Sequence, residues 1–280
     1  MKYLNLGCGY NYSTEREWIN VDFISTGAGV LAHNLLTGIP FKNNSFDLVY
    51  HSHVLEHFKK EDAEIFIQDC LRVLKPGGII RIAIPDLETI ATNYLNLLKQ
   101  GIEYPNDELI ELNYTWTMLE LYDQTVRTKS GGNMANFIFN DTIKNEQFIT
   151  ERLGQEVIDL RASYLERKNQ IVNKYGEISQ KDKWFKNISS IKKALKNYLL
   201  EKLHVDQNNL AIGNFRQGGE IHQWMYDRYS LSKLLYAKGA SQIEKRDPFT
   251  SYISNWEQFG LDGIRPVVRK PDSLFMEAIK

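Results

Sequence analysis

The run from Ile79 to Ile84 constrains the fold of this chain more than any other stretch of its sequence. It is short and rich in isoleucine, and only Arg81 and Ala83 interrupt it. A largely apolar run of this length is typical of a strand that is buried on both faces, as the central strands of parallel sheets are. The chain is therefore expected to fold around a sheet that is covered on both sides.

Other strand-length apolar runs precede and follow this one: Lys2 to Leu6, Trp18 to Asp22, Gly29 to Ala32, Phe46 to Tyr50, Gln242 to Lys245 and Ser273 to Ile279. Apolar residues recur at helical spacing between Glu61 and Leu74, where Pro76-Gly77-Gly78 then ends the helix, and again between Tyr226 and Ala237. Strands that alternate with helices predict an α/β fold with a doubly wound, mostly parallel sheet and right-handed crossovers.

A long stretch without convincing strands interrupts this alternation. From Leu87 to Gly219 the sequence shows helical periodicities only. At 280 residues the chain lies at the upper limit of what one hydrophobic core supports, so one domain with an insertion is expected rather than two independent halves. We predict that residues 1–100 and 220–280 form the α/β core and that residues 101–219 form a helical insertion or lid.

Composition and charge argue against several classes of protein. The chain is 42% hydrophobic and 25% charged, and its net charge of −1 provides no overall field that would attract nucleic acid. Its two cysteines are too few for a disulfide framework and indicate a reducing compartment. No apolar run approaches the roughly 20 residues that span a bilayer, and Met1 leads directly into a strand pattern. A cytoplasmic protein is expected.

The segment Gly7-Cys8-Gly9 follows the first predicted strand and forms a tight turn, which we call the glycine loop. Two glycines at the carboxyl end of a strand let the backbone approach a ligand without a Cβ in the way. A dinucleotide-binding loop would have a third glycine where Tyr12 stands, and its ribose-binding acid would follow about 20 residues later, whereas Asp22 comes sooner. The loop therefore fits a ligand other than a dinucleotide, although a purely structural turn remains an alternative.

Four segments together resemble the class I S-adenosylmethionine-dependent methyltransferases, of the type 11-like family related to small-molecule and ubiquinone-pathway enzymes. They are LNLGCG at the glycine loop, INVDF at the second strand, IPFKNNSFDLVYHSHVLEH across the fourth and LRVLKPGGIIRIAIPD around the fifth. The resemblance covers residues 2–86, is looser over 226–280 and does not explain the insertion. It implies a Rossmann-like seven-stranded sheet, S-adenosylmethionine as cofactor and methyl transfer as activity.

The resemblance also implies roles for individual residues. Gly7 and Gly9 make room for the methionine part of the cofactor, and Asp22 accepts hydrogen bonds from both ribose hydroxyls, which one carboxylate can do. Asn34 stands where the family commonly has an acid that contacts the adenine amino group, and Asn5 likewise replaces a frequent acid. The other expected cofactor contacts are Cys8, Phe23, Leu35, His51 and Ser52.

Methyl transfer requires chiefly that the acceptor atom be held in line with the sulfur that leaves, and a hydroxyl acceptor also benefits from a general base. A histidine, whose pKa lies near neutrality, suits that task. The candidate catalytic residues are His53, His57, Asp86 and His222, the last of which follows the insertion. The expected acceptor is a hydroxyl or similar group on a small molecule or glycan.

A metal site is also conceivable at His51, His53, Glu56 and His57, but it is not expected. The side chains of residues 51 and 53 need not converge in a loop, and no clear fourth ligand follows. Packing or helix capping is an alternative role for His57.

Two segments mix aromatic, charged and glycine residues: Glu120 to Asn133 and Gly218 to Trp224. We predict that they fold as a lid over the carboxyl edge of the sheet, with a helical cap that serves only packing as the alternative. Tyr122, Asp123, Arg127 and Trp224 would suit a sugar-like acceptor, which requires stacking and hydrogen bonds together.

Residues 181–202 include seven lysines against Asp182 and Glu201, with apolar residues along one helical face. This pattern fits either a surface helix that packs on its neighbour or a basic helix that contacts a partner or the inner face of an anionic membrane. It leaves two alternative functions open, a nucleic-acid-associated protein and a non-catalytic scaffold that retains the cofactor fold. The sequence leaves the oligomeric state open.

Overall fold

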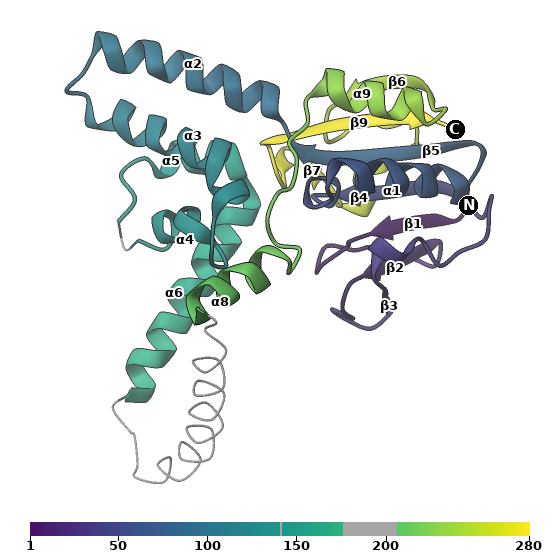
Figure 1. Cartoon of the computed structure of the whole chain (residues 1–280), viewed down its shortest axis with the longest axis horizontal. Coiled ribbons are helices and arrows are strands. Elements are labelled where there is room, and N and C mark those ends of the chain that lie inside the picture. The colour runs from purple at the N-terminus through teal and green to yellow at the C-terminus, as the bar shows by residue number, and fades with distance from the viewer. Residues whose placement is uncertain (141, 176–205) are drawn as a thin grey trace.

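The computed structural model describes residues 1–140, 142–175 and 206–280, and its centre is a seven-stranded sheet (Figure 1). The strands are β1 (Tyr3–Leu6), β2 (Trp18–Asp22), β3 (Val30–Ala32), β4 (Phe46–Ser52), β5 (Leu74–Pro85), β6 (Ser241–Arg246) and β9 (Ser273–Ile279). Their order in the sheet is β3-β2-β1-β4-β5-β9-β6, with β1 to β5 parallel and β9 antiparallel to both of its neighbours. The predicted mostly parallel, seven-stranded α/β fold is confirmed.

One face of the sheet is covered by two helices, α1 (Lys60–Val73) and α9 (Arg228–Ala237). Their buried side chains, including Phe66 and Leu231, pack on strand residues such as Val49 and Ile82. Helix α1 has acidic residues in its first turn, where their negative charge interacts favourably with the positive end of the helix dipole. Helix α9 begins after a capping box formed by Asp227 and Ser230, so it starts two residues later than the apolar pattern predicts.

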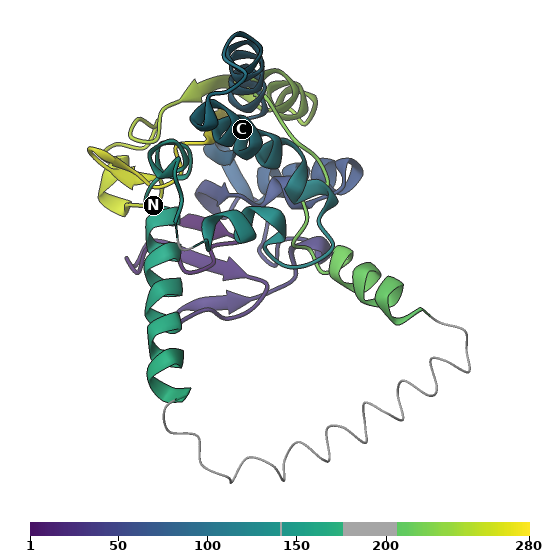
Figure 2. The same cartoon turned by 90° about the vertical axis from the view of Figure 1, so that its left-hand side faces the viewer.

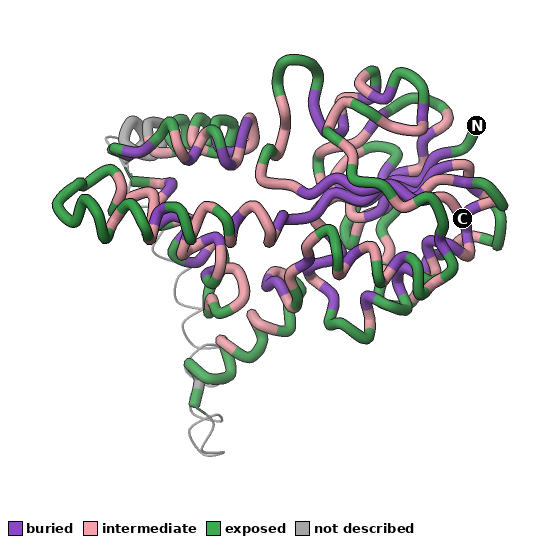
Figure 3. The backbone as a smooth tube through the Cα atoms, turned by 90° about the horizontal axis from the view of Figure 1, so that it is seen from above, coloured by how far each residue is buried: buried purple, intermediate pink, exposed green. Residues whose placement is uncertain are grey.

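The opposite face is covered by residues 247–262, which we call the covering segment. Its short helix η4 (Trp256–Phe259) and the adjoining residues pack on aromatic side chains of β1, β2 and β4. Trp18 lies at the centre of this contact, edge-on to Tyr3 and to Phe259 with ring centroids 5.2 Å apart in each pair. Figure 3 shows the buried strands as a layer enclosed from both sides. The short hairpin β7 (Gly263–Ile264) and β8 (Val267–Val268) follows the covering segment.

Arg81 fixes the covering segment to the sheet. Its guanidinium is fully buried and contacts Asp262 at 2.8 Å and Glu277 at 2.9 Å. It also donates to the carbonyl oxygens of Asp247 and Thr250, so its donors serve two carboxylates and the turn at the start of the covering segment. Asp262 in turn accepts from the hydroxyl of Tyr50 and the indole of Trp256, and every charge in the network therefore has a partner.

The connections on the β1 side of the sheet are short. Residues 7–17 join β1 to β2 without a helix, and residues 23–29 join β2 to β3. The short helices η1 (Leu35–Thr37) and η2 (Leu55–His57) precede and follow β4. Because the covering segment occupies this face, no crossover helix is required to bury it.

The described part of the insertion is helical and lies beyond the carboxyl edge of the parallel strands (Figure 1). Its helices are α2 (Leu87–Glu103), α3 (Glu108–Val126), α4 (Gly132–Ile138), α5 (Glu146–Leu153), α6 (Gln155–Tyr175) and α8 (Gln207–Arg216). Trp116, Met134 and Ile149 belong to a separate small core, beside a buried ion pair between Glu120 and Arg152. In Figures 1 and 2 the chain returns from α8 to α9 beside the sheet.

The predicted boundaries of the insertion, residues 101 and 219, stay a prediction. Helix α2 continues across the first of them, since it ends at Glu103. The basic segment 181–202 lies outside the described residues. None of the helices described is both long and apolar enough to cross a membrane.

Replacing Arg81 by methionine tests the role of the network. The Arg81→Met change leaves the buried Asp262 carboxylate without its cation and leaves Glu277 with only the partly exposed Arg246, so the free energy of unfolding should fall by about 3 to 5 kcal/mol in urea titrations. The matched control is Lys144→Ala, which removes an ion pair with Glu108 whose side chains are 60% and 64% exposed. That variant should lose less than about 1 kcal/mol. Equal losses in the two variants would contradict the assigned role.

Candidate functional site

A cavity of about 290 Å³ lies at the carboxyl edge of the sheet, between the glycine loop and the end of β4. The residues that line it are Asn5, Gly7, Cys8, Gly9, Tyr10, Asn11, Tyr50, Ser52, His53, Glu156, Arg269 and Lys270. Ligands of open α/β sheets bind at this edge, where the strand order changes direction. The sheet changes direction between β1 and β4, so the cavity is a candidate ligand site.

The two glycines of the loop have different surroundings. Both have left-handed backbone conformations, with φ of 64° at Gly7 and 55° at Gly9. A Cβ on Gly7 would lie 2.3 Å from Cγ2 of Val54, so Gly7 allows the loop after β4 to pack against it. A Cβ on Gly9 would meet nothing within 4 Å. Gly9 therefore leaves open space beside the backbone, as a closely bound ligand requires.

Asp22 extends from the end of β2 to the glycine loop. Its Oδ2 accepts a hydrogen bond from the backbone N–H of Gly9 at 2.7 Å. The side chain of Thr26 also donates to the carbonyl oxygen of Gly9, so this glycine is held from both sides. Burial, assisted by the charge of Asp22, raises the pKa of the Cys8 thiol to about 11. A carboxylate has further lone pairs, so Asp22 can brace the loop and still accept from a ligand hydroxyl.

Three predicted cofactor residues lie on β1 and β4, and they face different environments. Asn5 is buried and donates to the carbonyl oxygen of Asn11, and both Asn5 and Ser52 line the cavity. His51 is fully buried on the other face of the sheet, 5.2 Å from the ring of Phe66, and burial lowers its pKa to about 4. Because side chains alternate along a strand, His51 packs in the core and does not line the cavity.

Three further predicted contacts lie around β2 and β3. The side chain of Asn34 accepts from the backbone N–H of Leu36 and caps η1. Leu35 packs against the core, whereas Phe23 is 71% exposed. None of the three lines the cavity at the glycine loop, so a contact with adenine remains a prediction for this edge of the sheet.

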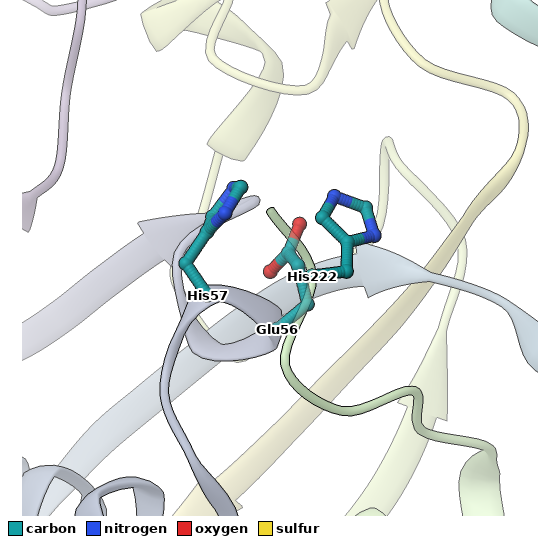
Figure 4. A group of neighbouring side chains, drawn as sticks. All are labelled: Glu56, His57 and His222. Carbon is teal, nitrogen blue, oxygen red and sulfur yellow. The ribbon is translucent and has the colours of Figure 1, made fainter. Parts of the chain in front are cut away.

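His53, Glu56, His57 and His222 meet beside the cavity, and we call them the His–Glu cluster. His53 Nδ1 lies 3.2 Å from Oε1 of Glu56, which is 1% exposed. The His57 and His222 rings lie edge to face with centroids 4.9 Å apart, and Figure 4 shows the Glu56 carboxylate between them. Three of the four predicted catalytic residues therefore converge on a carboxylate that the prediction did not include.

Burial and charge act in opposite directions within the cluster. Burial alone would raise the pKa of Glu56, but the neighbouring histidines, His53 first, outweigh it and lower that pKa to about 2. Burial lowers the pKa of His222 to about 3. At neutral pH the cluster therefore contains an ionised Glu56 and a neutral His222.

The backbone of His53 also distinguishes this site. Its φ of 54° lies in the left-handed region, which is uncommon for residues other than glycine and costs roughly 1 kcal/mol or more. The imidazole is held at both nitrogens, because Nδ1 faces Glu56 and Nε2 lies 2.8 Å from Oγ of Ser273. These contacts fix the ring at the rim of the cavity.

Asp86, the fourth predicted catalytic residue, lies outside the cluster. Its carboxylate accepts from the N–H of Glu88 and the hydroxyl of Thr89, and it caps α2. Local capping geometry therefore accounts for this buried carboxylate.

The two predicted lid segments lie together over the cluster. Arg127 donates to the carbonyl oxygen of Glu220, and the N–H of His222 donates to the carbonyl oxygen of Gln124. The N–H of Gln223 donates to the carbonyl oxygen of Glu56, which connects the second segment to the loop after β4. Opening and closing of the lid remain a prediction.

Local sequence gave no signal for several residues at the site. Arg269, Lys270 and Ser273 follow the covering segment in the chain, far from the glycine loop. Glu56 lies in the motif Leu-Glu-His, but its burial among histidines depends on the return of the chain after the insertion.

A family model and a curated relative each match part of this chain. Residues 4–82 match a family model described as a methyltransferase domain. A Mycolicibacterium smegmatis protein named as a probable S-adenosylmethionine-dependent methyltransferase is 31% identical over 103 residues, which cover 31% of this chain and only 39% of that relative.

Among solved structures, the chain is similar to a methyltransferase of Thermotoga maritima described as a possible histamine N-methyltransferase. That likeness has a TM-score of 0.37 at 10% identity and covers 100% of this chain and 82% of the other. An S-adenosylmethionine-dependent methyltransferase of Mesorhizobium loti matches with a TM-score of 0.24 at 18% identity, over 30% of this chain and 47% of the other.

The two glycines provide a matched pair of substitutions. Gly7→Ala and Gly9→Ala both place a Cβ at positive φ, a cost of roughly 1 to 2 kcal/mol in each. Only Gly7→Ala also drives that Cβ into Val54, which should add about 1 to 3 kcal/mol. Urea unfolding should therefore show Gly7→Ala to be the less stable variant. The opposite order would mean that the space beside Gly9 is not open.

Proposed function

We propose that this chain, which contains a class I S-adenosylmethionine-dependent methyltransferase domain, transfers a methyl group to a hydroxyl of a small molecule or glycan. The observation that supports an oxygen acceptor most directly is the placement of His53. Its Nδ1 faces a buried carboxylate, and its Nε2, at the rim of the cavity at the glycine loop, contacts the hydroxyl of Ser273 at 2.8 Å and so lies where it can interact with a hydroxyl group. A base oriented in this way suits removal of a hydroxyl proton.

The residues at the cavity fit S-adenosylmethionine, the cofactor of this class of domain. When bound, it supplies an electrophilic methyl group on a positively charged sulfur. Gly9 has room beside its backbone for the methionine part. Asp22 does not itself line the cavity, but it contacts Gly9 and has lone pairs for the ribose hydroxyls. Arg269 and Lys270 line the cavity and would attract the carboxylate of the cofactor's methionine part, although Lys270 also forms an ion pair with Glu156 at 3.0 Å.

The chain's own residues would hold and deprotonate the acceptor. Nε2 of His53 would exchange its contact with Ser273 for one with the acceptor hydroxyl, and would take the hydroxyl proton as the methyl group passes to the acceptor oxygen. Glu56 then stabilises the resulting imidazolium through Nδ1, because its buried carboxylate is ionised at neutral pH. The lid segments would exclude water from the reacting groups.

A glycan acceptor is supported by the aromatic side chains near the lid. Tyr122 is 56% exposed and Trp224 is 43% exposed, so both can stack on a sugar ring. Asp123 and Arg127, which the sequence also suggested for sugar contacts, instead hold the lid together: Asp123 accepts from the N–H groups of Asn133 and Met134. The cytoplasmic location expected from the sequence is part of the same proposal.

Calorimetric titration with S-adenosylmethionine tests the cofactor assignment. Asp22→Ala should weaken binding by about 1 to 3 kcal/mol, the range for a lost charge-assisted hydrogen bond. Asp47→Ala is the control, since Asp47 lies at the other edge of the sheet, where it pairs with Lys75. The Asp47→Ala variant should bind S-adenosylmethionine with the same affinity as the parent. Unchanged affinity in Asp22→Ala would contradict the role of Asp22.

The base assignment is tested by labelled methyl transfer from the cofactor to fractions of cell extract. His53→Asn keeps a residue that tolerates the left-handed backbone but removes the base. Transfer should fall by about 100-fold or more, while cofactor affinity stays close to that of the parent. His33→Asn, at a histidine that contacts the carbonyl oxygen of Gly38 away from the cluster, should retain transfer.

Failure of the parent protein to label any fraction while it binds the cofactor would favour a non-catalytic scaffold. Label found only in nucleic acid would favour the nucleic-acid alternative. Equal transfer by His53→Asn and the parent would contradict the role of His53.

A further inference from the structure

We propose that Glu56, His57 and His222 bind a divalent transition-metal ion of the zinc class. One ligand atom from each of the three side chains lies within 4.8 Å of the other two. Figure 4 shows the Glu56 carboxylate between the two imidazoles, with His57 and Glu56 on one loop and His222 on another segment. This inference goes beyond methyl transfer and reverses the expectation from the sequence that no metal site is present.

The three ligand types match zinc chemistry. Imidazole nitrogen and carboxylate oxygen bind this ion at about 2.0 to 2.2 Å, and a set of two histidines and one glutamate is found at catalytic zinc sites. Ligand atoms around a tetrahedral ion lie roughly 3.4 Å apart, which follows from those bond lengths. The side chains must therefore close by little more than 1 Å, which small rotations of the side chains provide.

Contacts around the three side chains orient them for this role. His57 Nδ1 lies 3.2 Å from the carbonyl oxygen of Ile221, which can only accept, so the proton is on Nδ1 and Nε2 has the free lone pair. A ligating histidine is commonly fixed through its other nitrogen in this way. His53 occupies one side of Glu56 through Oε1, and the second oxygen, Oε2, is left for an ion.

The burial of Glu56 provides a second, independent observation. It is 1% exposed, and among the described residues neither of its oxygens has a well-aligned hydrogen bond. A buried carboxylate without such bonds is costly unless a cation compensates it. No lysine or arginine forms an ion pair with Glu56 in the described part of the chain, so a bound cation is the partner that its surroundings favour.

Three protein ligands leave a further position for an oxygen ligand. If the proposed methyl transfer to a hydroxyl is correct, the acceptor oxygen is the natural occupant, beside His53. That role depends on the proposed function, whereas binding of the ion does not.

The experiment uses the full chain without an affinity tag, first treated with a chelator and then titrated with Zn²⁺ by calorimetry, in the absence of cofactor and acceptor. Binding should saturate at one ion per chain. His57→Ala and His222→Ala should each weaken it by roughly 100-fold or more, since loss of an outer contact alone commonly costs 10- to 100-fold. Titration with Co²⁺ should give visible absorption bands that neither variant shows.

His33→Ala is the matched control, because it removes a histidine away from the cluster and should leave the affinity unchanged. Thermal unfolding without metal shows whether each variant is folded, and Glu56→Gln provides a third variant of similar shape. Absence of stoichiometric binding by the parent would overturn the proposal. The proposal would also be overturned if the folded His222→Ala variant bound Zn²⁺ as tightly as the parent does, whatever the result of the methyl-transfer assay.

Discussion

The buried guanidinium of Arg81 is the interaction on which the arrangement of this protein depends. It lies on the interior strand β5, where it connects Glu277 of β9 with Asp262 of the covering segment. Charged groups in a core are tolerated only when each is paired and hydrogen-bonded. Here the guanidinium is paired with two carboxylates, those of Asp262 and Glu277. The network holds the covering segment, and that segment buries the aromatic side chains of β1, β2 and β4 in place of a second layer of helices.

This arrangement changes how the glycine loop is held. In many α/β folds the loop after β1 leads into a helix, whose positive end attracts an anionic ligand group. Here residues 7–17 form no helix, and Asn11 instead donates to the carbonyl oxygen of Leu261 in the covering segment. Positive charge at the cavity comes from Arg269 and Lys270, which follow that segment in the chain. The Arg81 network and the cavity at the glycine loop are therefore connected through the same stretch of chain.

The parts of the fold that the sequence predicted are those that depend on local pattern. Apolar runs and turn residues located the strands, because each reflects the backbone preferences of a few neighbouring residues. Pro76-Gly77-Gly78 correctly signalled that α1 ends before it, but in the structure these three residues belong to β5, which begins at Leu74 rather than at Ile79. The covering segment has no regular period, so its packing was not predictable. Arg81 was visible only as an interruption in an isoleucine run, since its acidic partners are distant in sequence.

The same distinction applies to the site. His53, His57 and His222 could be chosen as candidates because imidazole has suitable chemistry, but their convergence on Glu56 required the chain to return after the insertion. Asp86 was chosen for its place after β5, and there the cap of α2 uses its carboxylate. Which of the candidate residues lie in the His–Glu cluster is therefore decided by contacts between distant parts of the chain, and residue type alone does not reveal it.

The loop after β4 joins the two halves of the site. Val54 packs against Gly7 of the glycine loop, while its neighbours His53 and Glu56 belong to the His–Glu cluster. The left-handed backbone of His53 turns the chain between these contacts, and its cost of roughly 1 kcal/mol or more is offset by the contacts at both imidazole nitrogens. A displacement of the glycine loop would therefore also shift His53, since Val54 is bonded directly to it. The glycine loop and the His–Glu cluster are thus connected through adjoining residues of one short loop.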